Sequence, residues 1–359
     1  MLTRRGLVAG SAAGLLSATL DATAQDRAAR VRVIDIHAHW YPPEWVALLE
    51  REGEGSGARM GRSARGHLTV STASLTVAMQ PQYIDVDYRL KAMDKAGVAM
   101  HALSLTQPMV FWAAPAFALR LCRTFNDACV ALHQKYPDRF VGLAMLPMQD
   151  PGLALQELDR VGTLPGLRGI YMGTHINGRN LDAKEYWPIY ARCEQRGLPI
   201  FLHPVDPVGA DRMRSYHLRN FIGNPADTAI AAASLIFSDA LDAFPALDVV
   251  LPHAGGVVPI LIGRWDHGAT VRPEVKDLKQ APSHYLRRFH YDTIAHNAAI
   301  LMNLVRQVGA DRIVVGTDFP ADMSDVDPVR TVEALTELSS GDRELILRGN
   351  AARLLKLPV

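Results

Sequence analysis

Cysteine is scarce in this chain, with three among 359 residues, and no two stand in the C-x-x-C spacing of a structural zinc site. Disulfide-stapled scaffolds and zinc-finger proteins are therefore excluded. Net charge is also nearly absent, since 38 Lys and Arg against 37 Asp and Glu give +1. Binding a polyphosphate backbone usually needs a basic surface, so nucleic acid is not an expected partner. An apolar content of 48% indicates a globular protein with a full core.

The first 25 residues have the pattern of an export signal. Arg4 and Arg5 precede an uncharged run rich in Gly, Ala, Leu and Ser, and Ala22-Thr23-Ala24 supplies an A-x-A cleavage site. The run is too short and too broken for a membrane span, which needs about 20 apolar residues. The paired arginines predict a twin-arginine signal, with an ordinary export signal as the alternative. We expect residues 1–25 to be removed and residues 26–359 to form one periplasmic domain that does not bind a membrane.

After this segment, short apolar or β-branched runs alternate with helical patterns, as in a parallel sheet built from βαβ units. The eight candidate strands are Val31–Ile36, Val98–Leu105, Phe140–Met145, Leu167–Met172, Pro199–Leu202, Leu247–Leu251, Phe289–Tyr291 and Ile313–Val315. No linker or composition break separates them. The pattern predicts an α/β fold, a single (β/α)8 TIM barrel with its active site on the loops that follow the strands.

The intervening helical patterns complete the units of the predicted barrel. They cover Asp87–Lys95, Pro115–Tyr136, Leu153–Val161, Lys184–Arg196, Ala226–Phe244, Val257–Trp265, Asn297–Val308 and a last region, Pro328–Leu355, broken near Gly341. The stretch Glu50–Gln82 is too polar and too short to form a core of its own. We interpret it as a long flap inserted after the first strand and lying over the barrel mouth.

Histidine and aspartate follow several of these strands at the rim where barrel enzymes place their catalytic groups. His37 and His39, two apart at the end of the first strand, can face the same side. His203 follows the fifth strand, His253 the sixth and Asp318 the eighth. Three imidazoles and a carboxylate suit a first-row divalent ion, with zinc expected and manganese as the alternative.

The fourth predicted strand decides between one metal ion and two. It ends in Tyr171-Met172-Gly173-Thr174, which offers no lysine to carry a bridging carbamate. We therefore predict a mononuclear centre with a position left for water or substrate.

These motifs, in this order, resemble the amidohydrolase superfamily, and within it the decarboxylase branch typified by 2-amino-3-carboxymuconate-6-semialdehyde decarboxylase. The resemblance covers nearly the whole chain beyond the signal. The matching motifs include Asp35-Ile36-His37-Ala38-His39, Met93-Asp94-Lys95-Ala96-Gly97-Val98, Leu202-His203-Pro204, His253-Ala254-Gly255-Gly256 and Gly316-Thr317-Asp318-Phe319-Pro320.

The resemblance implies roles for individual residues. It makes His37, His39, His203 and Asp318 the metal ligands, with His253 as the acid/base beside the metal-bound water. Asp318 thus serves both the metal and catalysis. Arg264 matches an arginine that binds a substrate carboxylate in the neighbouring subunit, so the resemblance also implies a homodimer.

The expected activity is metal-dependent decarboxylation, a carboxy-lyase reaction that removes CO2 from a small aromatic or unsaturated carboxylic acid. Trp40, Phe111 and Trp112 follow the first two strands and are predicted to wall the substrate pocket, although Trp40 suits packing under the flap equally well. The flap segment Ser74–Met79 lacks the second carboxylate-binding arginine of the semialdehyde decarboxylase.

The same site could instead serve a hydrolase that acts on a lactone, ester or amide, because fold alone does not determine function. A binding protein with a relic metal site is a third hypothesis. That hypothesis would require at least one of the site residues to be missing. All five positions, the four ligands and His253, are filled.

Overall fold

Eight parallel strands form one sheet in the order β1-β5-β6-β7-β10-β11-β12-β13, each beside its predecessor in the βα series. They span β1 Val33–His39, β5 Val98–Ser104, β6 Phe140–Met145, β7 Leu167–Gly173, β10 Ile200–His203, β11 Val249–Leu251, β12 Phe289–Asp292 and β13 Ile313–Val314. The computed structural model describes residues 33–275 and 277–358, so the predicted signal peptide lies outside the described residues. The predicted barrel is confirmed.

Single backbone hydrogen bonds close the barrel between its first and last strands. The N–H of Ile36 donates to the carbonyl of Val315 at 2.9 Å, and the N–H of Asp318 donates to the carbonyl of His37 at 2.9 Å. A further bond at 2.7 Å joins the N–H of His39 to the carbonyl of Phe319. Closure therefore places His37 and His39 beside Asp318, which comes from the other end of the sequence.

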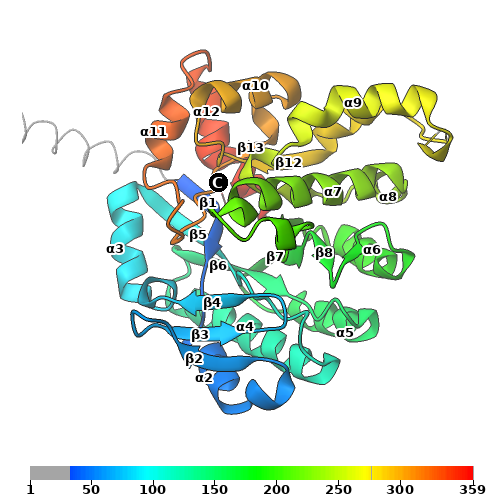
Figure 1. The fold of residues 1–359 in the computed structure, drawn as a ribbon. Helices are drawn as coiled ribbons and strands as arrows, with labels where there is room; N and C mark the ends of the chain where they lie inside the picture. The colour runs from blue at the N-terminus through cyan, green and yellow to red at the C-terminus, as the bar shows by residue number, and fades with distance from the viewer. Residues whose placement is uncertain (1–32, 276, 359) are drawn as a thin grey trace, which may run out of the picture.

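Helices surround the strands on the outside (Figure 1). They are α2 Pro43–Glu52, α3 Val86–Ala96, α4 Pro115–Lys135, α5 Pro151–Val161, α6 Trp187–Arg196, α7 Asn224–Phe237, α8 Ala240–Ala243, α9 Val258–Val271, α10 Ala298–Val308, α11 Pro328–Glu333, α12 Ser340–Glu344 and α13 Asn350–Leu354. Because helices cover them outside and side chains fill the barrel inside, β1 and β6 are buried along their whole length.

Several predicted boundaries differ from the structure. The first strand continues through His39 instead of ending at Ile36, because its last residues bond to the segment around Asp318. The predicted helix Ala226–Phe244 is two helices, since Asp239 between them adopts a left-handed conformation with φ of 61°. A left-handed residue cannot continue an α-helix, so the chain changes direction there.

The flap is a small antiparallel sheet of β2 Arg59–Arg62, β3 Leu68–Ser71 and β4 Thr76–Met79, which Figure 1 shows as a sheet separate from the barrel. Val70 and Met79 anchor it, being 0% and 2% exposed. The turn between β3 and β4 lines a cavity of about 550 Å³ together with Phe111 and Trp112, which follow β5. The predicted flap therefore does lie against the carboxyl-terminal rim of the barrel, and helix α2 precedes it.

None of the helices within residues 33–275 and 277–358 is both long enough and apolar enough to span a bilayer.

Candidate metal centre

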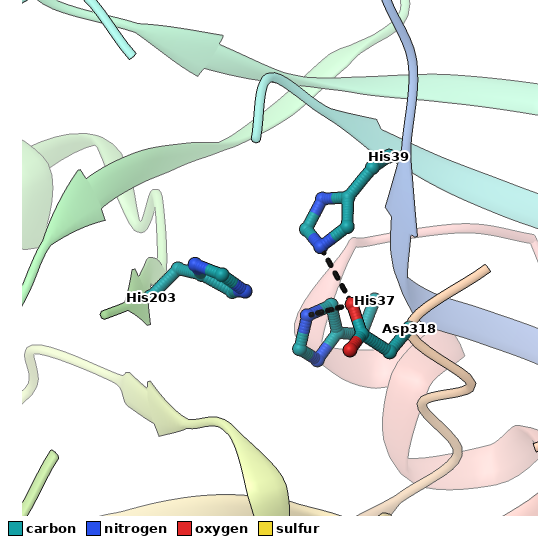
Figure 2. A group of neighbouring side chains, drawn as sticks. All are labelled: His37, His39, His203 and Asp318. Carbon is teal, nitrogen blue, oxygen red and sulfur yellow. Dashed lines mark ion pairs between the residues drawn. The ribbon is translucent and has the colours of Figure 1, made fainter. Parts of the chain in front are cut away.

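Four predicted ligands meet at the rim of the barrel (Figure 2). His37 and His39 come from β1, His203 ends β10, and Asp318 follows β13. One ligand atom from each lies within 4.8 Å of all the others, and all four residues are buried. Oδ1 of Asp318 is 2.8 Å from Nε2 of His39 and 3.5 Å from Nε2 of His37.

Hydrogen bonds on the outer nitrogen of each imidazole orient the rings. Nδ1 of His37 donates to Oδ2 of Asp292 at 2.8 Å, and Nδ1 of His203 donates to the carbonyl of Pro204 at 2.9 Å. Nδ1 of His39 lies 3.0 Å from the hydroxyl of Ser104, which itself donates to the carbonyl of Ala38. Occupied Nδ1 atoms leave the Nε2 lone pairs free to bind a metal ion.

The protonation of three of the four ligands also suits a metal ion. Burial lowers the pKa of His39 to about 4 and that of His203 well below its usual value. Burial opposes the charged form of Asp318, but contacts with His253 and His39 hold the pKa of its carboxyl well below the usual range. His39 and His203 are therefore neutral imidazoles that can donate an electron pair to a metal ion, and Asp318 is a carboxylate at neutral pH. Metal binding requires both.

Unpartnered nitrogen atoms indicate that the cluster is built for a ligand. Nε2 of His37 and Nε2 of His39 are buried and make no well-aligned hydrogen bond among the described residues, although both lie beside Oδ1 of Asp318. Burying two such nitrogen atoms without a partner costs free energy unless a metal ion binds to them. The donor set of three imidazoles and one carboxylate fits a divalent metal ion.

Asp292 is a functional residue that the sequence analysis missed. It is fully buried at the end of β12 and accepts four hydrogen bonds. Oδ2 accepts from His37 and from the backbone N–H of His253 at 2.9 Å, and Oδ1 accepts from the N–H groups of Ala254 at 2.7 Å and Ile294 at 3.0 Å. Its position directly after the predicted seventh strand Phe289–Tyr291, at the same rim as the other site residues, was the available signal.

His253 lies beside the ligands without joining them. Its Nε2 is 3.8 Å from Oδ2 of Asp318, and its ring centroid is 5.4 Å from that of His37. His253 and Ala254 both have positive φ values, 54° and 53°, which side-chain-bearing residues rarely adopt. Asp292 holds this turn through both backbone N–H groups, so the strain is maintained at a functional position.

A buried network of polar side chains around Asp35 also holds the first strand in place. Oδ1 of Asp35 accepts from the N–H of His37 at 2.9 Å, and Oδ2 accepts from the hydroxyl of Thr317 at 2.6 Å. Nε2 of His101 lies 3.3 Å from the same carboxyl, and Arg89 contacts Nδ1 of His101 at 3.2 Å and the carbonyl of His39. Burial raises the pKa of Asp35 to about 7.

The predicted substrate-binding residues separate into two groups. Phe111 and Trp112 line the cavity under the flap, as expected of pocket residues. Trp40 is 3% exposed, its indole nitrogen donates to the carbonyl of Ile84, and it is not among the residues that line the cavity under the flap. The structure therefore places Trp40 in the core under the flap.

Arg264 does not reach the metal centre of its own chain. It is exposed on α9 and borders a surface cavity of about 480 Å³ that includes Phe237 and Trp265 but none of the four ligands. Its predicted role concerns the site of a neighbouring subunit, which a single chain does not contain.

Comparisons with known proteins agree with this geometry. The family model for amidohydrolases matches residues 34–357. The 2-amino-3-carboxymuconate-6-semialdehyde decarboxylase of Dictyostelium discoideum is 34% identical over 330 residues, covering 90% of this chain and 91% of the relative. The gamma-resorcylate decarboxylase of Rhizobium radiobacter is 32% identical over 301 residues, covering 78% and 90%.

A solved structure shows the same architecture. The dihydroxybenzoic acid decarboxylase of Polaromonas sp., crystallised with manganese and the inhibitor 2-nitroresorcinol, superposes with a TM-score of 0.74 at 27% identity and covers 91% of this chain and 97% of its own. The motifs, the barrel and the ligand cluster all agree with these matches. The chain belongs to the amidohydrolase family, in the branch that contains these decarboxylases.

Proposed function

We propose that this chain is a metal-dependent decarboxylase that removes CO2 from a small aromatic or unsaturated carboxylic acid. The observation that carries the proposal is the complete His37, His39, His203 and Asp318 cluster with His253 beside it. The relatives described above are all named decarboxylases, which favours loss of CO2 over hydrolysis at this site.

Each residue of the site has a chemical task in this reaction. A divalent ion held by the four ligands would act as a Lewis acid and stabilise negative charge on substrate oxygens. The bond between the ring carbon and the carboxylate breaks, CO2 leaves, and the electron pair stays on the carbon. His253, which lies beside the ligands, then donates a proton to that carbon as a positioned general acid. Asp292 keeps His253 in place through its backbone.

Zinc is the metal that we propose for this centre. Three imidazole nitrogens and one carboxylate oxygen form a donor set typical of zinc. Manganese is the alternative, and the related decarboxylase of Polaromonas was crystallised with it. Metal analysis of the purified protein, followed by activity after reloading with each ion, distinguishes the two.

A homodimer with Arg264 contributed in trans also belongs to the proposal, on the strength of the family resemblance. Mixing two inactive variants tests it. A dimer of one His253→Ala chain and one Arg264→Gln chain contains one site with both an intact His253 and an intact partner arginine. Recovery of activity on mixing supports the arrangement, and its absence at full dimer exchange contradicts it.

We further propose that the protein is exported to the periplasm by the twin-arginine route, on the basis of residues 1–25. Replacing Arg4 and Arg5 by Lys should retain the protein in the cytoplasm. Export of the double variant at the normal rate would contradict the proposal.

The central experiment measures CO2 release from a panel of aromatic and unsaturated acids by the metal-loaded protein. His253→Ala should keep its metal and lose turnover, whereas His284→Ala, exposed in the segment Pro282–Arg288 that precedes β12 and so lies at the opposite rim, should retain turnover. No CO2 release from any acid, together with hydrolysis of lactones or esters, would replace the decarboxylase by the hydrolase.

A further inference from the structure

The loop that follows β12 borders a cavity of about 380 Å³ beside the metal centre. His253 and Asp318 lie in the wall of the same cavity. The volume is near the lower end of small-molecule pockets, which span roughly 300–1,000 Å³. The cavity therefore suits one substituted ring whose reacting end lies at the metal.

The buried and the exposed parts of this wall carry different groups. Ile294 and Leu304 are 5% and 2% exposed and give the interior apolar walls. Asp318 is 8% exposed and belongs to the same interior. His296 and Ile300 are exposed and therefore lie at the opening. A bound ring thus has apolar side walls, the metal centre at its inner end and the imidazole of His296 at its outer end.

The imidazole of His296 is free to bind a ligand. It forms no hydrogen bond, ion pair or ring contact with any other described residue. Among the described residues of this wall, only His253 and His296 can carry a positive charge, and His253 already has a task at the reacting carbon. An imidazole donates from one nitrogen when neutral and from both when protonated, so His296 suits a negatively charged partner.

His296 also borders a second cavity, of about 330 Å³, which includes none of the four metal ligands. Two carboxylates, those of Asp325 and Asp327, and one guanidinium, that of Arg330, line this second cavity. The excess of negative charge disfavours an anion there. An anionic group that reaches His296 is therefore bound on the other side, in the cavity beside the metal.

The backbone holds His296 in a conformation that residues with a side chain rarely adopt, with φ of 52°. On one side of it, the N–H of Ile294 donates to Oδ1 of Asp292 at 3.0 Å. On the other side, Asn297 caps α10 by accepting from the N–H of Ala299 at 2.9 Å. Both neighbours are fixed, so His296 cannot relax to an ordinary conformation. Backbone strain of this kind is concentrated at functional positions.

The same loop is joined to the segment that carries a metal ligand. The hydroxyl of Thr293 donates to the carbonyl of Gly316 at 3.2 Å, and the N–H of Gly316 lies 3.3 Å from the same hydroxyl oxygen. Gly316 stands two residues before Asp318. His296 therefore has a fixed place relative to the metal centre, and it can set the distance between the two ends of a bound ring.

We infer that His296 is a specificity-determining residue, and that it binds a negatively charged substituent at the end of the substrate remote from the metal. The leaving carboxylate lies at the metal, so the second group stands meta or para to it and not beside it. The inference rests on the proposed decarboxylation for the identity of the leaving group. The position of the cavity and the free imidazole of His296 support the rest.

Inert ligands separate binding from turnover, because a nitro group has the shape of a carboxylate and cannot leave as CO2. In 3-hydroxy-4-nitrobenzenesulfonate, the nitro and hydroxyl oxygens can bind the metal together, and the sulfonate lies para to the nitro group. The corresponding sulfonamide is neutral, and 3-hydroxy-2-nitrobenzenesulfonate carries its sulfonate beside the nitro group. Calorimetry measures the affinity of each for the metal-loaded full chain. We expect the para sulfonate to bind about fivefold more tightly than the sulfonamide and about tenfold more tightly than its isomer.

His296→Asn assigns the preference to the residue, because asparagine also tolerates the left-handed backbone. The para sulfonate and the sulfonamide should then bind within about twofold of each other. For an acid that the protein decarboxylates, KM should rise with little change in kcat, because the contact is equally strong before and during the reaction. Adding Ile300→Lys, at a position in the same wall that is 57% exposed, should restore the preference, whereas adding Ile300→Gln should not. Retained metal and unchanged melting temperature confirm that the variants are folded.

The contrary outcomes are distinct. A preference that persists in His296→Asn overturns the role of His296, and its loss in Arg264→Gln would assign the remote group to that arginine instead. Equal or tighter binding of the isomer with adjacent groups overturns the remote position. No preference for the para sulfonate in the unaltered protein, or no binding of any compound, also overturns the inference. If the preference depends on His296 but no acid releases CO2, the proposed decarboxylation fails while the role of His296 stands.

Discussion

Oδ2 of Asp292 lies 2.8 Å from Nδ1 of His37, although 255 positions separate the two residues in the chain. The contact joins the end of β12 to β1 past β13, the one strand that separates them in the barrel. Since the same carboxylate also accepts from the backbone of His253, it orients one metal ligand and the proposed proton donor together. The geometry of the metal and of the acid is thus linked through one side chain.

Asp292→Asn tests this link. The amide has the same shape but cannot accept at every position, and it weakens the hold on His37, so we expect metal affinity to fall about 10- to 100-fold. Competition with a chelator measures the change.

The matched control is Asp248→Asn. Asp248 also contacts a histidine, with Oδ1 3.2 Å from Nε2 of His290, but it precedes β11 and so lies at the opposite rim. Its loss should leave metal affinity unaltered. Equal metal affinity in Asp292→Asn and the unaltered protein would show that other contacts suffice to orient His37.

The ligand residues could be predicted because parallel barrel strands end at one rim, so polar residues just after apolar runs become neighbours. The role of Asp292 could not be predicted, because a single aspartate after a strand forms no recognisable sequence motif. Its role depends on its distance from His37, which only the closed barrel sets. For the same reason, the sequence could not decide whether the Trp40 side chain lies in the substrate pocket or in the core.

The helices show a second limit of the sequence. Periodicity predicts one helix over Ala226–Phe244, since the apolar spacing continues past Ser238. The break at Asp239 is a single left-handed residue, and no apolar pattern records such a change of backbone.

Metal binding should stabilise the fold. A ligand that binds only the folded state contributes about 4 kcal/mol when its free concentration is a thousandfold above the dissociation constant. We therefore expect added zinc to raise the melting temperature of the metal-free protein and of His253→Ala by similar amounts. Asp318→Ala should show little or no increase, because a ligand is missing. A full increase in Asp318→Ala would remove Asp318 from the ligand set.

Arg89 should be a major contributor to stability although it lies outside the metal centre. It is fully buried, contacts His101 and the carbonyl of His39, and its guanidinium carbon lies 4.9 Å from the ring centroid of Phe319. Arg89→Met removes these contacts and leaves buried acceptors unpaired, so we expect a loss of about 3 kcal/mol in the free energy of unfolding.

Urea denaturation of the metal-free protein measures this loss. Arg51→Met is the control, because Arg51 forms an exposed ion pair with Glu52 at 2.9 Å and should contribute no more than about 1 kcal/mol. Similar small losses in both variants would mean that the network around Arg89 is replaceable.

Arg219 connects the flap to the barrel rim and should control how often the flap opens. One guanidinium nitrogen lies 2.7 Å from Oδ1 of Asp206, which follows β10, and another donates to the carbonyl of Ser74 at 3.4 Å, in the turn between β3 and β4. Both contacts are partly solvated, so together they should contribute about 1 kcal/mol or less. Arg219→Gln should therefore speed amide exchange in the turn 72–75 by a factor of up to about five and lower the melting temperature by no more than about 2 °C.

Hydrogen exchange followed by mass spectrometry resolves this turn from the rest of the flap. The control is Arg179→Gln, which breaks an exposed ion pair with Glu185 of 2.8 Å that does not touch the flap. If the turn covers the bound substrate, Arg219→Gln should also raise KM more than it lowers kcat, because a flap that opens more often releases substrate before it reacts. Faster exchange with unaltered KM would show that the turn opens more often but does not cover the bound substrate. Unaltered exchange would show that the buried side chains of Val70 and Met79 hold the flap sheet without help from Arg219.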